Sequence, residues 1–148
     1  MRNNSQHGTT IMKNYVLFVF MSIFTHSVIA NESFMNDCKK LLYKDQIATL
    51  KQTKNGFAQI REEAKSEEEI QLVNKTEKEF FDSFENHTKS VCTCIKDEVV
   101  SSLELIGESE SNINQNLTDL GKAMLSGYYW GINEVTRSAF QEAMHCGE

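Results

Sequence analysis

The sequence predicts an all-α fold, a disulfide-linked antiparallel bundle of about four helices. The chain of 148 residues contains no proline, the residue that interrupts helices most strongly. Apolar residues recur every three or four positions with charged residues between them, which is the spacing of amphipathic helices. Covalent bonds between distant helices are possible because the chain has four widely spread cysteines: Cys38, Cys92, Cys94 and Cys146.

Cys92 and Cys94 lie inside the longest predicted helix, residues 66–106. Each residue turns a helix by about 100°, so two residues two apart point about 200° from each other. A bond between them would close a very small ring and break the helix. Each is therefore expected to bond a different distant cysteine, Cys38 or Cys146, although the sequence leaves open which pairs with which. Either loop would exceed about fifty residues, which corresponds to roughly 4 kcal/mol in the chain-entropy model.

A metal site is the competing interpretation, with the four thiolates, or with His145 beside Cys146, as ligands. Structural zinc sites usually use C-x2-C or longer spacings because two ligands must converge on one ion. A C-x-C pair on a helix does not converge, so the sequence favours disulfides over a metal and over free thiols. We expect no cofactor.

Residues 1–30 have the three parts of a signal peptide. Met12 and Lys13 begin a basic start, an apolar run follows at 15–24, and the small residues Val28 and Ala30 precede a polar stretch. The run is short for a membrane span, which takes about 20 residues, so a retained anchor is the second choice. Met12 is a possible true start. The predicted location is outside the cytoplasm, either periplasmic or secreted, where disulfides persist.

The predicted mature chain, residues 31–148, is long enough for one helical domain. Without Arg2 and Lys13 it has 13 Lys and Arg against 21 Asp and Glu, a formal charge of −8. An acidic chain without a basic cluster is a poor candidate for binding nucleic acid or an anionic membrane.

The first mature helix is predicted to begin near Ser33, and Asn55-Gly56 is a predicted turn or helix end. Ser66 and Glu69 form a capping-box pattern that opens the central helix, and a break near Asn86-His87 is plausible. The glutamates of that first turn suit the positive end of the helix dipole. An acidic recognition patch is the alternative role for them: Glu67 and Glu68, with Glu62, Glu63 and Glu69.

Residues 107–116 are rich in turn formers and are a predicted loop. The last helical region then includes the unusual segment Gly127-Tyr128-Tyr129-Trp130-Gly131 and ends at His145-Cys146-Gly147. On a helix, the two glycines would share one face and allow close packing. The alternative is an exposed aromatic patch that binds a partner, because Tyr and Trp dominate binding hot spots.

Four glycosylation sequons of the predicted mature chain begin at Asn31, Asn74, Asn86 and Asn116. They would carry glycans in a eukaryotic secreted protein and could be coincidental in a bacterial one.

No motif for catalysis is present, so we do not expect an enzyme. The favoured hypothesis is an exported protein-interaction module, of inhibitor or immunity type, that binds a protein partner through aromatic or acidic residues: Tyr128, Tyr129, Trp130, Glu67 and Glu68. The alternative is a helical carrier of an apolar small ligand or lipid, with a cavity lined by residues such as Phe80, Phe84, Met124 and Tyr128. Exposed Tyr129 and Trp130 would favour the first hypothesis, and an enclosed apolar cavity the second.

Overall fold

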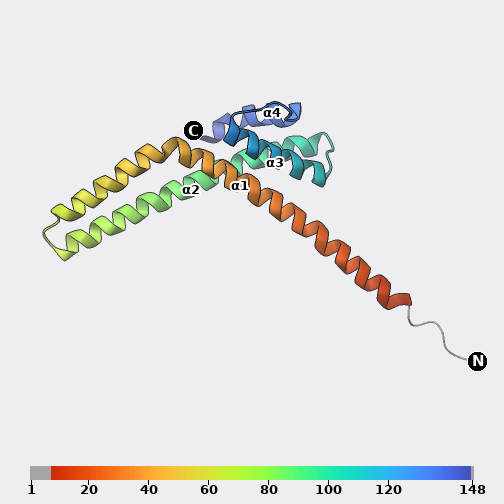
Figure 1. Ribbon diagram of the computed structural model, residues 1–148, viewed down its shortest axis with the longest axis horizontal. Coiled ribbons are helices and arrows are strands. Elements are labelled where there is room, and N and C mark those ends of the chain that lie inside the picture. The colour runs from red at the N-terminus through yellow and green to blue at the C-terminus, as the bar shows by residue number, and fades with distance from the viewer. Residues whose placement is uncertain (1–7, 148) are drawn as a thin grey trace, which may run out of the picture.

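The computed structural model describes residues 8–147, with side chains from Asn31 onward, as an all-α protein (Figure 1). Its elements are α1 (Gly8–Glu63), α2 (Glu67–Leu105), α3 (Glu110–Ser126), α4 (Glu134–Glu142) and the 3-10 helix η1 (Ala143–Gly147). This confirms the predicted fold class of a disulfide-linked helical bundle.

The described side chains form two regions that differ in how completely they are buried, which we name the head and the arm. The head comprises residues 31–42 and 88–147, where α3 packs on α1 and where α4 and η1 pack on α2. The arm comprises residues 43–87, where α1 and α2 form an antiparallel pair that projects from the head (Figure 1). Every buried apolar side chain of the described core belongs to the head: Phe34, Cys38, Val91, Cys92, Ile95, Val99, Leu103, Ile113, Leu117, Leu120, Ala123, Met124, Ile132, Ala139 and Ala143.

The central helix α2 begins and ends as predicted. The Ser66 hydroxyl accepts a hydrogen bond from the Glu69 backbone N–H at 3.2 Å, and the Glu69 carboxylate accepts one from the Lys65 backbone N–H at 2.6 Å. These two bonds satisfy N–H groups that have no partner within the helix. The predicted break at Asn86-His87 is wrong, since α2 runs through it without interruption.

The predicted turn at Asn55-Gly56 is also wrong, because α1 continues through it to Glu63. A glycine inside a helix costs about 0.5–1 kcal/mol relative to alanine. The next residue, Phe57, packs its ring 6.2 Å from that of Phe80 on α2, and this contact favours the continuous helix.

The loop predicted at residues 107–116 is much shorter in the structure, because α3 already begins at Glu110. The Ser109 hydroxyl accepts a hydrogen bond from the Asn112 backbone N–H at 3.3 Å and caps that helix. Gly107, with φ of 80°, makes the tight turn that remains between α2 and α3.

Gly121 of α3 marks a close approach to α1. A Cβ added there would lie 3.3 Å from the Asp37 Cβ and 3.4 Å from the Phe34 Cα. Because Gly121 has no side chain, the backbone of α3 can pack directly against α1.

Both C-x-C cysteines form disulfides with distant partners, as predicted, and the structure supplies the pairing. Cys38 of α1 bonds Cys92, with Cα atoms 5.9 Å apart, and Cys146 of η1 bonds Cys94, with Cα atoms 5.8 Å apart. The central helix is thus joined to α1 on one side and to the C-terminal segment on the other. Two disulfides fit an extracellular or otherwise oxidising compartment.

The predicted signal peptide, residues 1–30, lies outside the residues whose side chains the structure describes. Within the part of the chain that is described, no helix combines the length and the apolar character needed to cross a membrane.

Candidate interaction surface at the aromatic loop

Residues 127–131, named here the aromatic loop, are the first part of the non-helical connection between α3 and α4. Gly127 caps α3 in the left-handed conformation, with φ of 72°, and its N–H donates to the Ala123 carbonyl at 2.8 Å. Gly131 also has a positive φ, 91°. The prediction of a helix with both glycines on one face is therefore wrong, because each glycine adopts a conformation that ends a helix.

The three aromatic side chains of the loop differ sharply in exposure. Trp130 is 89% exposed and Tyr128 is 73% exposed, whereas Tyr129 is half-buried. The Tyr129 ring stacks on that of Phe140 in α4, with centroids 5.8 Å apart and planes at 19°. Two of the three aromatic residues predicted to bind a partner therefore face solvent, and the third fixes the loop to the head.

Hydrogen bonds hold the loop at several points. Arg137 of α4 donates from Nη2 to the Tyr129 carbonyl at 2.9 Å, and the Tyr128 N–H donates to the Ser126 hydroxyl at 3.3 Å. Beyond the loop, Ile132 is buried and the Asn133 side chain caps α4 by accepting from the Val135 N–H at 2.8 Å. The backbone that presents Tyr128 and Trp130 is therefore anchored on both sides.

Burial also affects the chemistry of the anchoring tyrosine. Removal from water disfavours the phenolate, so the pKa of Tyr129 is raised above its ordinary value of 10.0. The Tyr129 hydroxyl therefore keeps its proton to a higher pH than an exposed tyrosine does.

A surface cleft of about 230 Å³ lies beside the two exposed aromatic rings. Asp119 and Lys122 of α3 line it, with the carboxylate and the ammonium 3.9 Å apart. Apolar and charged groups thus border one hollow, a combination that suits a side chain of a protein partner. Its complete lining is Asp119, Lys122, Ala123, Ser126, Tyr128, Trp130, Gly131 and Ile132.

The structure does not bring together the residues nominated for a carrier cavity. Met124 is buried in the head and Tyr128 is exposed on the aromatic loop. Phe80 and Phe84 lie in the arm, where Phe84 packs edge-on against Tyr43 at 5.1 Å. These four side chains lie in different parts of the molecule, so the predicted cavity lining is not formed.

Glu67 and Glu68, the two acidic candidates, are exposed in the first turn of α2. This turn lies at the tip of the arm, away from α4 (Figure 1). The acidic and aromatic candidates therefore form two separate surfaces.

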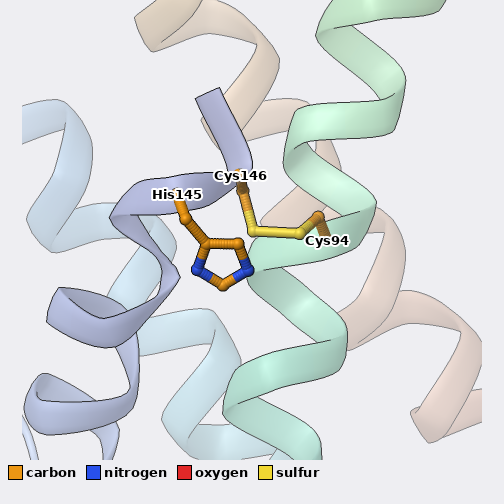
Figure 2. A group of neighbouring side chains, drawn as sticks. All are labelled: Cys94, His145 and Cys146. Atoms are coloured by element: carbon orange, nitrogen blue, oxygen red, sulfur yellow. A yellow bond between two sulfur atoms is a disulfide. The ribbon is translucent and has the colours of Figure 1, made fainter. Parts of the chain in front are cut away.

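A second cluster surrounds the C-terminal disulfide (Figure 2). The sulfurs of Cys94 and Cys146 and a ring nitrogen of His145 lie within 4.8 Å of one another. The His145 Nδ1 is 2.8 Å from the Glu142 carbonyl oxygen, and its Nε2 is 4.0 Å from a carboxylate oxygen of Glu98. A site with all four thiolates is excluded, because Cys38 and Cys92 are bonded to each other elsewhere.

The four sequons differ in their surroundings. Asn116 is half-buried, donates to the Asn112 carbonyl at 2.8 Å and accepts from the buried Thr136 hydroxyl at 3.1 Å. A glycan would be attached to the same amide nitrogen that donates to the Asn112 carbonyl. Asn74 is exposed and accepts from the Arg61 Nε at 2.7 Å, and Asn86 is exposed on α2.

Searches for similar proteins found no matching family model, no matching curated sequence and no matching solved structure.

Proposed function

We propose that this protein is an exported protein-interaction module, of inhibitor or immunity type, that binds a protein partner through the aromatic loop and catalyses no reaction. The observation that supports the proposal is the exposure of Trp130 and Tyr128, at 89% and 73%, on a backbone held by the rest of the head. Neighbouring large apolar side chains that remain in water mark interaction sites more often than isolated ones do.

The chemistry of these two side chains suits a binding hot spot. An aromatic side chain of this size buries roughly 150–250 Å² in a complex and retains a polar atom that can hydrogen-bond at the rim. The adjacent cleft places a carboxylate, Asp119, and an ammonium, Lys122, beside the aromatic rings. Hot spots combine such an apolar anchor with a polar surround.

The rigidity of the head supports the proposal on energetic grounds. Ordering a flexible loop on binding reduces affinity, because its side chains and backbone lose conformational freedom. Here Arg137 holds the Tyr129 carbonyl and Phe140 holds its ring before any partner arrives. More of the energy of burying Trp130 is therefore available for affinity.

Glu67 and Glu68 form a separate candidate contact at the tip of the arm. They would extend the interface only if the partner reaches from the head to the tip of the arm. We assign them a secondary role, since their position also follows from the helix dipole of α2.

The test uses photo-crosslinking followed by affinity measurement. A photoreactive residue at position 130 should capture a protein from the native environment, whereas the same residue at position 105 should not. Leu105 is the matched control, because it is also 89% exposed and apolar but lies at the end of α2.

With the captured partner purified, Trp130→Ala should weaken binding by about 30-fold, which corresponds to about 2 kcal/mol, and leave the melting temperature unchanged. Leu105→Ala should change neither. Equal capture from both positions, or wild-type affinity for Trp130→Ala, would remove the basis for the proposal. A bound apolar small molecule in place of a protein would favour the carrier hypothesis.

A further inference from the structure

The two disulfides differ in their access to solvent. Cys38 and Cys92 are fully buried, whereas Cys94 and Cys146 are partly exposed. A reducing thiolate must reach a sulfur atom to attack it, so exposure governs which bond is opened first. A dithiol reductant should therefore open Cys94–Cys146 while Cys38–Cys92 remains intact.

Opening the C-terminal disulfide leaves its two cysteines close together. α4 and η1 still pack on α2 through Ala139 and Ala143, which are 3% and 2% exposed. The Cα atoms of Cys94 and Cys146 are 5.8 Å apart, so rotation of the side chains alone can separate the thiols. The reduced protein thus presents two thiols on one surface.

His145 is oriented as a metal-ligating histidine is. A carbonyl oxygen can only accept a hydrogen bond, so the 2.8 Å contact with the Glu142 carbonyl places the ring proton on Nδ1. The lone pair is then on Nε2, the nitrogen that faces Glu98 of α2. A backbone carbonyl that fixes the tautomer and orientation of a ligand histidine is a common support in metal sites.

The fourth candidate ligand comes from the sequence spacing of α2. Cys94 and Glu98 are four residues apart and share a helix face. Opposite them, η1 supplies His145 and Cys146, as Figure 2 shows for the three residues it draws. The objection to a C-x-C metal site does not apply, because only one cysteine of that pair takes part.

Reduction and side-chain rotation would bring these atoms to the spacing found around one zinc ion. Ligand atoms of a tetrahedral zinc lie about 3.3–3.8 Å apart, given bonds of about 2.0–2.3 Å. The sulfurs and the ring nitrogen lie within 4.8 Å of one another, and Nε2 is 4.0 Å from the Glu98 oxygen. Reduction frees the two sulfurs, which are covalently bonded in the disulfide, to separate to that spacing. The Glu98 carboxylate must then rotate toward them, which its exposed position on α2 permits.

We propose that reduction of the Cys94–Cys146 disulfide creates a zinc-binding site made by Cys94, Glu98, His145 and Cys146. In the first step a dithiol reductant is oxidised to its own disulfide, and Cys94 and Cys146 each gain one hydrogen atom. In the second step Zn²⁺ binds both sulfurs and displaces the two thiol protons into solvent. Two thiolates and an imidazole select zinc over magnesium or calcium.

The test starts with the purified protein and limiting dithiol, which is removed before metal is added. Mass spectrometry should show a gain of two hydrogen atoms, and thiol labelling should place them on Cys94 and Cys146. Titration with Co²⁺ under exclusion of oxygen should then produce thiolate-to-cobalt charge-transfer absorption that saturates at one ion per protein. Added Zn²⁺ should abolish this absorption, and the oxidised protein should show none.

His145→Ala should weaken Co²⁺ and Zn²⁺ binding at least tenfold, with the helical circular dichroism signal retained because His145 is exposed. His87→Ala is the matched control, since His87 is also an exposed histidine and lies on α2, seven residues before Cys94, and this variant should bind metal as the wild type does. Reduction of Cys38–Cys92 first, absence of the cobalt absorption in the folded reduced protein, or equal affinity of the two variants would overturn the proposal.

Discussion

The head and the arm are built from the same two long helices, yet only the head contains fully buried side chains. In the head, α3 packs on α1, and α4 and η1 pack on α2, so the long helices have further helices to pack against. In the arm the two helices cover only the seam between them, and apolar side chains such as Ile47 and Leu72 remain 66% and 63% exposed. The difference shows that a pair of helices needs a second layer to form a core.

In the arm, ion pairs, hydrogen bonds and a narrow apolar seam stabilise the two helices in place of a buried core. Arg61 of α1 forms an ion pair with Glu77 and donates to Asn74, both on α2. Exposed i,i+4 pairs add a few tenths of a kcal/mol each along α2, as Lys75 with Glu79 and Lys78 with Asp82 illustrate. The seam itself consists of half-buried aliphatic and aromatic side chains: Leu50, Phe57, Val73, Phe81 and Phe84.

The largest predicted effect is a difference in the free energy of unfolding between two leucine-to-alanine variants, one in the head and one in the arm. Leu117→Ala in the head should lower the free energy of unfolding by about 3 kcal/mol, because Leu117 is fully buried and its loss leaves a cavity. Leu72→Ala in the arm should lower it by less than about 0.5 kcal/mol. Urea denaturation of the two variants measures both values. Similar losses would mean that the arm is as well packed as the head.

A medium effect should appear at the tip of the arm. Ser66→Ala removes the hydroxyl that caps α2 and should cost about 1 kcal/mol. Hydrogen exchange should accelerate for arm amides near Val73 and stay unchanged near Leu103, because the arm can open while the head remains folded. Ser83→Ala, at an exposed site inside α2, is the matched control. Because alanine favours the helix more than serine does, this variant should slightly slow hydrogen exchange in the arm. Acceleration of equal size in both regions would show that they unfold together.

The smallest effect concerns Tyr129 at high pH. Its pKa is raised by burial, so the folded protein holds the phenol proton more tightly than the unfolded chain does. Stability from this group is complete below pH 10 and is lost as the pH rises through the folded-state pKa. Tyr129→Phe keeps the ring that stacks on Phe140 and should show a shallower alkaline decline in the free energy of unfolding. Identical declines for the variant and the wild type would contradict this assignment.

The features predicted correctly from the sequence follow from local geometry that allows only one favourable arrangement. The C-x-C geometry determined that Cys92 and Cys94 bond different partners, and the Ser66 cap marked the start of α2. The choice between Cys38 and Cys146 could not be predicted, because it depends on which face of α2 meets α1.

The errors concern residues whose conformation tertiary contacts decide. Gly56 is helical and Gly127 and Gly131 are left-handed, although glycine permits either conformation at similar local cost. Contacts of the neighbouring side chains decide which conformation each glycine adopts, since Phe57 packs across the arm while Tyr129 stacks on Phe140. At the candidate site, Tyr128 and Trp130 were nominated from composition alone, and the inward position of Tyr129 required the structure.

The order of the disulfides along the chain determines how the molecule would carry mechanical load. A pull between Asn31 and Gly147 would pass along covalent bonds from Cys38 to Cys92, through Thr93 to Cys94, and on to Cys146. The whole arm and the α3–α4 segment lie in loops outside this path, so they would experience no stretching force. With both disulfides intact, only the few residues outside the loops can extend, and most of the fold would stay intact under tension.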